Sequence, residues 1–253
     1  MTGIPHVQIR LLGSFSVFVE GRQAALPHSA QRVMVALALR PQEMDRAILG
    51  GMLYPDTRQS QVSANLRSAL WRTKRATGLT VVDSCGQHVR LAEGIQVDLH
   101  AWSHRARVLT AGQGNDLARD VADVVHALSE ELLPAWSEEW LILERQRWDH
   151  LRLHALERLA DELVTQGRHM EALEAGHAAV AIEPYRESAY RTLIKAYIAE
   201  GNNASALTLY HRCRRLLIRD LGVSPTTQIQ ALIQTILRNT PGVDHDLTHD
   251  LRH

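Results

Sequence analysis

The chain has 253 residues, enough for two domains, and its 45% hydrophobic and 22% charged residues exclude a disordered chain. No apolar run is long enough to cross a membrane, and the start of the chain lacks the basic and apolar regions of a signal peptide. We therefore expect a cytoplasmic protein with no membrane partner. The net charge of zero hides a division: residues 1 to 108 hold 13 Lys and Arg against 7 Asp and Glu, and the rest hold 15 against 21. A positively charged first part is what a nucleic-acid-binding domain needs.

The chain begins with a pattern typical of strands. Short runs rich in β-branched residues over 6–13 and 16–20 predict two strands of a small antiparallel sheet. Ser29 is a good N-cap, and it predicts a helix over 30–39 with Val33, Ala36 and Leu37 facing inward.

A second helix is expected over 46–54, capped by Asp45. Gly50 and Gly51 lie inside it, and each costs about 1 kcal/mol relative to alanine in a helix.

The next helix, over 59–75 and ending at Gly78, has two different sides. At 100° per residue one side forms an apolar stripe of Val62, Leu66, Ala69, Leu70 and Thr73. The segment contains no acidic residue. Its other side and flank carry Ser60, Gln61, Ala64, Arg67, Ser68, Trp71, Arg72, Lys74 and Arg75.

Small side chains near the start of such a helix let it approach base edges in the major groove, and longer cations near its end reach phosphates. Arg67 is the best candidate for reading a base, because a guanidinium pairs bidentately with guanine. Arg72, Lys74 and Arg75 suit phosphate contacts. Trp71 points away from the apolar stripe, which suits a contact with DNA or with a neighbouring hairpin, or simple packing. An ordinary solvated face is the alternative for the whole segment.

A β-hairpin is predicted directly after this helix, with strands over 79–83 and 87–91 and a tip at Ser84-Cys85-Gly86. Three helices followed by a hairpin is the order of a winged helix-turn-helix domain, in which the third helix enters the major groove.

After a helix over 100–109 and a break at 111–115, the rest is expected to be helical. The residues Leu159, Leu163, Gly167, Ala172 and Leu173 recur 34 positions later as Leu193, Tyr197, Gly201, Ala206 and Leu207. That period predicts tetratricopeptide-like helix pairs. The block 128–151 would supply a helix before the stack, and 229–237 would close its other end. Such a stack is a protein-interaction platform, or an array that only packs and dimerises.

The fold class expected from these patterns is mainly α with a small β component. A winged helix-turn-helix domain over 1–108 precedes a tetratricopeptide-like all-α domain over 109–240 and a polar tail over 241–253.

Several segments resemble the Streptomyces antibiotic regulatory protein (SARP) family of bacterial transcriptional activators. Residues 49–56 look like the end of its second helix, 64–72 like its recognition helix and 97–100 like the strand that leaves its wing. The second half is similar to its bacterial transcriptional activation domain in 133–136, 140, 143–145, 151–157, 183–189, 199–202 and 220–225, in the right order. The chain departs from the family in having Thr73 and Thr77 where leucine is usual, and in a hairpin tip without a cation. The absence of a cation at the tip leaves Arg90, or His88, as the candidate DNA contact of the wing.

The resemblance implies an activator that binds direct repeats in promoter DNA, with a second protomer side by side. It also implies recruitment of RNA polymerase holoenzyme through its sigma factor and other subunits, and regulation of secondary metabolism such as antibiotic biosynthesis. No paired carboxylates, metal-binding triads or nucleophile motifs occur, so we expect no enzymatic activity, cofactor or metal. A protein-binding scaffold without promoter binding is the alternative, and a regulator that binds a small molecule in the helical groove is a third possibility.

Overall fold

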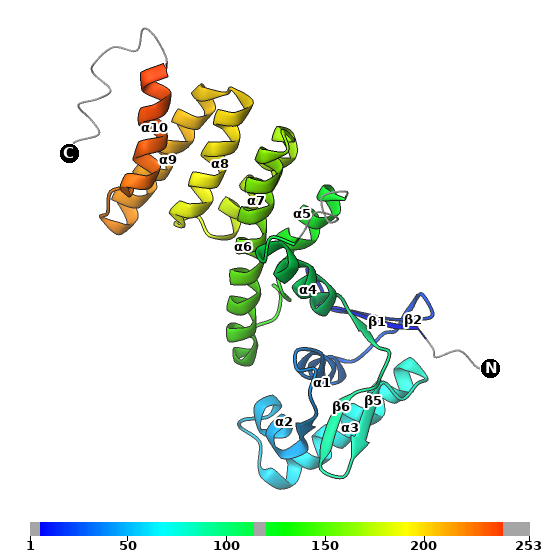
Figure 1. Cartoon of the computed structure of the whole chain (residues 1–253). Coiled ribbons are helices and arrows are strands. Elements are labelled where there is room, and N and C mark those ends of the chain that lie inside the picture. Colours follow the sequence, from blue (N-terminus) through cyan, green and yellow to red (C-terminus); the bar gives the residue numbers. More distant parts are fainter. Residues whose placement is uncertain (1–5, 114–119, 240–253) are drawn as a thin grey trace. The chain divides into compact units, whose positions relative to one another are not determined.

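A computed structural model describes residues 6–113 and 120–239, and within them the protein is mainly helical with two small sheets (Figure 1). The chain forms two compact units, each made of two separate stretches. The first unit comprises Met1–His104 and Glu130–Trp148, and the second comprises Arg105–Ser129 and Asp149–His253. Domain boundaries at 108 and 240 stay predictions, and the tail over 241–253 lies outside the described residues.

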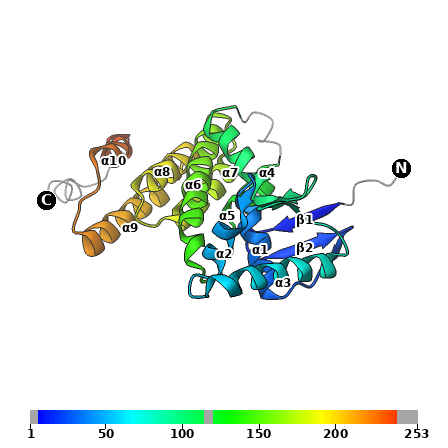
Figure 2. The same cartoon turned by 90° about the horizontal axis from the view of Figure 1, so that it is seen from below.

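The first sheet has the strand order β3-β2-β1-β7, and Figure 2 shows β1 beside β2. The antiparallel pairing of β1 (Val7–Arg10) with β2 (Ser16–Val19) confirms the predicted sheet, although both strands are shorter than expected. Two two-residue strands extend the sheet, β3 (Arg22–Gln23) beside β2 and β7 (Gln96–Val97) parallel to β1.

Helix α1 (His28–Ala38) begins earlier than predicted, and Ser29 is not its N-cap. Pro27 occupies that position with φ −65° and ψ 151°, and its carbonyl accepts the first helical hydrogen bonds. Proline fixes φ before the helix and donates no amide hydrogen, so it starts the helix without a side-chain cap. Val33, Ala36 and Leu37 are buried as predicted.

Helix α2 (Arg46–Leu53) begins as predicted. The carboxylate of Asp45 accepts hydrogen bonds from Ala47 N at 2.7 Å and Ile48 N at 3.3 Å. Gly50 is required by packing, because a Cβ there would lie 2.4 Å from Cγ1 of Val62 on the following helix. Gly51 faces open space, so nothing around it requires glycine.

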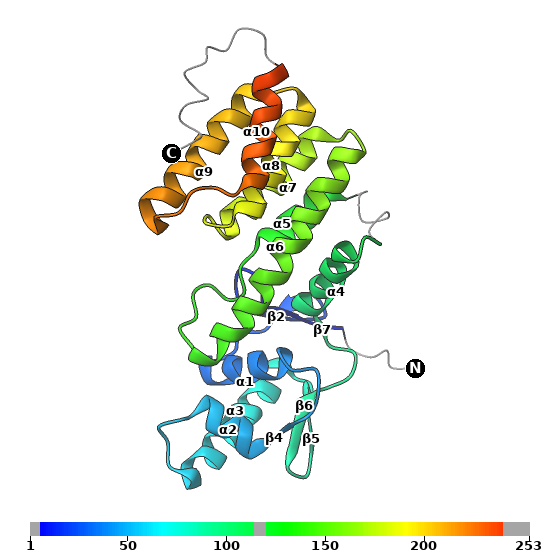
Figure 3. The same ribbon diagram turned by 60° about the vertical axis from the view of Figure 1, so that its left-hand side comes forward.

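The hairpin follows helix α3 (Gln59–Thr77) as predicted, but its tip is displaced. Ser84 and Cys85 belong to strand β5 (Val82–Cys85), which pairs with β6 (His88–Leu91). The turn is Gly86-Gln87, and Gly86 takes the positive φ of 57° that a two-residue hairpin turn favours. Strand β4 (Met44–Asp45) pairs with β6, and Figure 3 shows this sheet next to α1, α2 and α3.

The block 128–151 does not form the single helix that we predicted. It contains the end of α5 (Val121–Ser129), an irregular segment, the short helix η2 (Glu139–Leu141) and the start of α6 (Ile142–Thr165). The irregular segment pairs with the first sheet through an antiparallel bridge between Leu12 and Leu132 and a 2.7 Å hydrogen bond from Gly13 N to Glu131 O. Buried extended backbone needs partners for its amide groups, and the residues that follow β1, Leu11 to Gly13, supply them.

The second unit contains the predicted helix pairs, α6 with α7 (His169–Ile182) and α8 (Glu187–Glu200) with α9 (Asn203–Leu221). Gly167 and Gly201 take positive φ at equivalent turns, as the repeat requires. Helix α10 (Thr227–Asn239) closes the stack as predicted, burying Ile229, Ile233 and Ile236.

Helix α4 begins two residues before the predicted start, at Asp98, and ends at Thr110. The predicted break begins at Ala111 and Gly112, and its last two residues lie outside the described part of the chain. Within residues 6–113 and 120–239, no helix is both long and apolar enough to span a bilayer.

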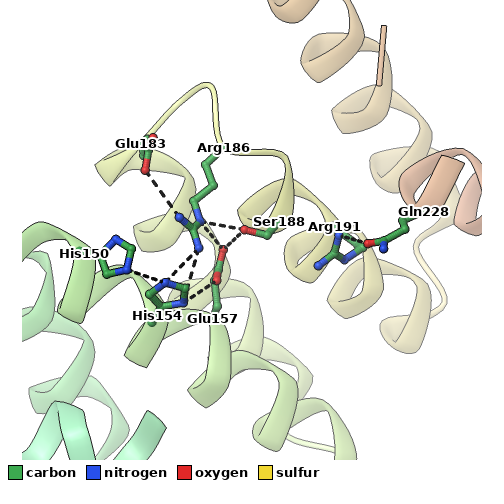
Figure 4. Close-up of polar contacts among 8 residues, drawn as sticks. All are labelled: His150, His154, Glu157, Glu183, Arg186, Ser188, Arg191 and Gln228. Atoms are coloured by element: carbon green, nitrogen blue, oxygen red, sulfur yellow. Dashed lines mark hydrogen bonds and ion pairs between the residues drawn. The ribbon is translucent and has the colours of Figure 1, made fainter. Parts of the chain in front are cut away.

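A polar network ties α6 to the start of α8 (Figure 4). Glu157 accepts hydrogen bonds from Ser188 Oγ at 2.5 Å and from Arg186 Nε at 3.2 Å. Nη2 of Arg186 also lies 3.2 Å from Nε2 of His154, whose ring stacks edge-on against His150 one turn earlier. The network fixes the register of the two helices. A neutral His154 ring can accept a hydrogen bond from the Arg186 guanidinium, whereas a protonated ring would repel it.

Candidate nucleic-acid interface

The side of α3 that faces the core is the apolar stripe that the sequence predicted. Val62, Leu66, Ala69 and Thr73 are at most 4% exposed. Thr73 and Thr77, which replace leucine in the family pattern, donate their hydroxyl hydrogens to the carbonyls of Ala69 and Thr73 at 3.0 and 2.9 Å. Each buried hydroxyl therefore has a hydrogen-bond acceptor within α3, so the two threonines can replace leucine without turning the helix.

The other side of α3 faces solvent. The nine candidate residues on this helix are all exposed, namely Ser60, Gln61, Ala64, Arg67, Ser68, Trp71, Arg72, Lys74 and Arg75. Lys74 and Arg75 lie in the last turn, where the helix dipole favours cations, and Gly78 ends the helix at φ 69°. The helix thus presents a long surface without an acidic side chain.

Two of these cations have partners within the first unit. Nη1 of Arg72 donates to Oγ of Ser29 on α1 at 3.2 Å. The guanidinium of Arg75 stacks 5.2 Å from the ring of Trp71, which is 58% exposed. Trp71 therefore does not pack in the core, and the Arg75 guanidinium lies over one face of its ring.

A groove of about 590 Å³ separates α3 from the hairpin. Arg67, Trp71 and Lys74 line one side, and β5 with Arg90 lines the other. Arg46, which the sequence analysis missed, adds a further cation to this groove. In the sequence, only the positive charge of Arg46 could have marked it as a candidate. Its place in the groove depends on a long-range contact, the hydrogen bond from Arg46 N to Gln87 O between the start of α2 and the hairpin.

Arg90 is exposed but paired, which the sequence analysis did not foresee. Its Nη2 lies 3.3 Å from Oε1 of Glu93 and 3.8 Å from Oδ2 of Asp83. These are solvent-exposed ion pairs, which are weak and screened by salt. Both contacts use Nη2, so the other donors of the Arg90 guanidinium remain available to a phosphate, but the two carboxylates oppose a polyanion near the hairpin.

Residues from beyond the hairpin support this face, which sequence reasoning also missed. Glu138 accepts hydrogen bonds from Arg32 Nη2 at 2.8 Å and Trp140 Nε1 at 3.1 Å. Trp140 packs against the core that contains Leu66 and Ala69 of α3, and Trp136 stacks on His28 at 5.0 Å. The segment around η2 thus helps to hold the three helices together.

The fold defines a winged-helix protein with an appended unit of paired helices, and its third helix presents an exposed cationic side. Residues 97–237 match the family profile described as the bacterial transcriptional activator domain, which is more than half of the chain. The protein belongs to this family, the SARP type of transcriptional activators.

Among known proteins, the chain is similar to regulatory protein AfsR of Streptomyces coelicolor, at 32% identity over 92% of this chain and 24% of AfsR. It also resembles regulatory protein DnrI of Streptomyces peucetius, at 25% identity over 74% of this chain and 71% of DnrI. A solved structure of Mycobacterium tuberculosis EmbR in complex with a low affinity phosphopeptide has the same fold, with a TM-score of 0.77 and 20% identity. That match covers 95% of this chain and 67% of the EmbR chain. The chain thus spans about a quarter of the length of AfsR.

Proposed function

We propose that the protein is a sequence-specific activator that binds double-stranded promoter DNA through α3. The observation that carries the proposal is the acid-free outer side of α3, held toward solvent by its buried stripe. A helix of this kind fits the major groove, where base edges and both phosphate rims are within reach. The cationic groove beside the hairpin extends the same surface.

The exposed residues of α3 differ in side-chain length and charge, and we assign them different roles on that basis. Ser60, Ala64 and Ser68 are small enough to let the helix approach base edges, with Gln61 on the flank. Arg67 reads a base from the middle of the helix. Arg72, Lys74 and Arg75 bind phosphates, as does Arg90 through its remaining donors, and Trp71 packs on the sugar-phosphate backbone.

The second unit supplies the activating contact. We infer that the stack of helix pairs binds RNA polymerase holoenzyme, including its sigma factor, while two protomers lie side by side on direct repeats. The similarity to the regulatory proteins AfsR and DnrI supports a regulatory role. The resemblance to the SARP family suggests that the regulated pathway belongs to secondary metabolism. An activator of this kind would work in the cytoplasm, where bacterial DNA lies, and its binding to DNA would need no cofactor.

Footprinting on the DNA upstream of its own gene, followed by fluorescence polarisation at several salt concentrations, tests the proposal. Arg67→Ala should cost about 1 to 3 kcal/mol on the preferred site and relax its specificity. Lys74→Ala should weaken all sequences alike and lower the salt slope by about 1. Arg107→Ala, an exposed arginine in the second unit, is the matched control and should change neither quantity.

Unchanged affinity and salt slope in both α3 variants would contradict the assigned surface. A protein complex that is unaffected by Arg67→Ala and Lys74→Ala, with no footprint anywhere upstream, would favour the scaffold instead. Half-sites in direct orientation would support side-by-side protomers, whereas an inverted repeat would indicate a two-fold dimer.

A further inference from the structure

The acidic half of the chain is not acidic throughout. Residues 109–202 hold 17 Asp and Glu against 9 Lys and Arg, whereas residues 203–239 hold one acidic residue and five arginines. The switch falls at the start of α9, so the last two helices of the stack in Figure 1 are basic. Such a local excess attracts an oppositely charged partner despite the opposite sign of the surrounding half.

The cations of α9 lie on its outer side. Ala206, Leu209, Tyr210, Cys213 and Leu217 face the stack and are buried. Arg212, Arg215 and Arg219 recur at intervals of three and four on the opposite, exposed side. Within the described residues, neither Arg212 nor Arg215 has a hydrogen-bond or ion-pair partner, whereas Arg219 pairs with the adjacent Asp220 at 2.5 Å.

Large apolar side chains are exposed at the same end of the unit. Ile218 is 43%, Leu221 53% and Val223 49% exposed around the last turn of α9. Tyr185, 46% exposed in the turn before α8, donates a 3.1 Å hydrogen bond to Asp220 and so contacts the last turn of α9. At 100° per residue, Ile218 lies between Arg215 and Leu221 around the helix, about 60° from each, and Arg212 and Arg219 lie beyond Arg215. Arg212, Arg215, Ile218, Arg219 and Leu221 thus cover half of the circumference, with the cations at one edge and Leu221 at the other, and we call them the α9 face.

The carboxylates near the α9 face are already engaged. Asp220 takes hydrogen bonds from Arg219 and Tyr185. Glu187 on α8 accepts hydrogen bonds from the backbone amide of Thr226, at 2.8 Å, and from its hydroxyl. Neither carboxylate is placed to neutralise Arg212 or Arg215, so the α9 face keeps an excess of positive charge.

We propose that the α9 face docks an acidic amphipathic segment of a partner protein, whose carboxylates meet Arg212 and Arg215 and whose apolar side chains cover Ile218 and Leu221. The inference rests on the proposed role of the second unit in holding the transcription machinery, and it names the face and the chemistry of the bound segment. Nucleic acid shares the negative charge, but a phosphate backbone gains nothing from covering exposed leucine and isoleucine side chains. A protein segment buries them and forms the charged rim that is usual around an apolar contact.

The test uses the full chain and two synthetic peptides of about 15 residues, four helical turns. The acidic amphipathic peptide carries leucines on one helical side and glutamates elsewhere, and the acidic polar peptide has serine in place of every leucine. Binding is measured by fluorescence anisotropy. We expect the amphipathic peptide to bind at least about tenfold more tightly than the polar one, because charge alone contributes little at physiological salt.

Pairs of matched variants distinguish a contact at the α9 face from a general effect of changing the charge or the apolar surface of the protein. Arg215→Glu should weaken the amphipathic peptide by about tenfold or more, whereas Arg107→Glu, with the same charge change at another exposed position of the second unit, should change its affinity less than about twofold. Leu221→Ser should weaken it by about fivefold, whereas Met170→Ser on α7, which is 67% exposed, should not. Circular dichroism of each variant verifies that the helices are intact.

Equal affinity of both peptides, or equal effects of Arg215→Glu and Arg107→Glu, would overturn the proposal. So would a loss of duplex DNA binding specific to Arg215→Glu, which would assign the face to nucleic acid. Self-association that Arg215→Glu abolishes would assign it to a second copy of the chain. Polymerase holoenzyme that still binds Arg215→Glu at full affinity, with no peptide binding, would leave the proposed function intact and remove only this surface.

Discussion

Arg32 on α1 and Glu138, more than a hundred residues later, form a hydrogen-bonded ion pair of 2.8 Å in which both side chains are about four-fifths buried. The same Nη2 of Arg32 donates to the carbonyl of Leu53 at the end of α2, at 2.6 Å. The pair therefore fixes the last turn of α2, from which the chain enters α3. The part of the protein that presents α3, the proposed DNA-binding helix, includes a segment from beyond the hairpin.

Removing the carboxylate should destabilise the first unit. Glu138→Ala leaves a mostly buried guanidinium with one partner fewer, and we expect a loss of about 1 to 3 kcal/mol in the free energy of unfolding. Urea denaturation followed by tryptophan fluorescence measures it. Glu139→Ala removes the same charge from an exposed neighbour and should stay within about 0.5 kcal/mol of the parent. Equal losses in the two variants would show that Glu138 has no special role.

The two adjacent glycines of α2 should respond in opposite directions to alanine. Gly50→Ala places a methyl group 2.4 Å from Cγ1 of the stiff, buried Val62, and overpacking of this kind costs about 1 to 3 kcal/mol. Gly51→Ala meets no atom within 4 Å and should gain about 0.5 to 1 kcal/mol from helix propensity. Thermal unfolding of both variants measures the difference.

Adding Val62→Ala to Gly50→Ala tests whether the clash with Val62 causes the loss of stability. In Gly50→Ala combined with Val62→Ala, the clash is gone, so the double variant should lose less stability than the sum of the two single variants. Strict additivity would mean that Gly50 is needed for some other reason.

The carboxylates beside Arg90 should limit DNA affinity. Asp83→Asn releases Arg90 from a 3.8 Å ion pair and removes a negative charge from the groove, so we expect tighter binding at low salt by about two- to fivefold. The gain should shrink as salt rises. Glu43→Gln, an exposed change of equal charge elsewhere in the first unit, controls for net charge. Comparable gains in both variants would show that proximity to Arg90 is irrelevant.

Mild acid should weaken the link between α6 and α8. Burial, followed by the nearby Arg186 guanidinium, lowers the pKa of His154 below its usual 6.5, with Glu157 opposing. The unfolded chain therefore binds this proton more readily than the folded chain, so the stability contributed by neutral His154 is present above pH 6.5 and is lost as pH falls through 6.5 toward the folded pKa.

Urea midpoints measured between pH 5 and 8 test this dependence. His154→Gln should show a shallower fall in the midpoint below pH 6.5 than the parent protein. The pKa of His177 is lowered in the same direction by burial and then by Arg212, so some pH dependence should remain in that variant. Identical profiles for parent and variant would exclude a contribution from His154.

Local patterns predicted much of the first unit, and the reason is that they depend on short-range sterics and hydrogen bonds. The 3.6-residue period determined which side of α3 is buried, Asp45 determined where α2 begins, and Gly78 determined where α3 ends. The 34-residue period predicted the helix pairs of the second unit, because each pair repeats the same turn and the same small residues.

Only the tertiary structure decided which of these surfaces meet. The bridge between Leu12 and Leu132 places the segment before α6 in the first unit, although we predicted that the block 128–151 would supply a helix before the stack. Arg46 lines the groove because β4 pairs with β6, a strand distant in the sequence. The carboxylates that hold Arg90 are close in sequence, Asp83 across the hairpin and Glu93 three residues later, but only the formed hairpin turns them toward the guanidinium. Sequence periodicity specifies the faces of single elements, whereas contacts between elements depend on long-range packing that no local pattern encodes.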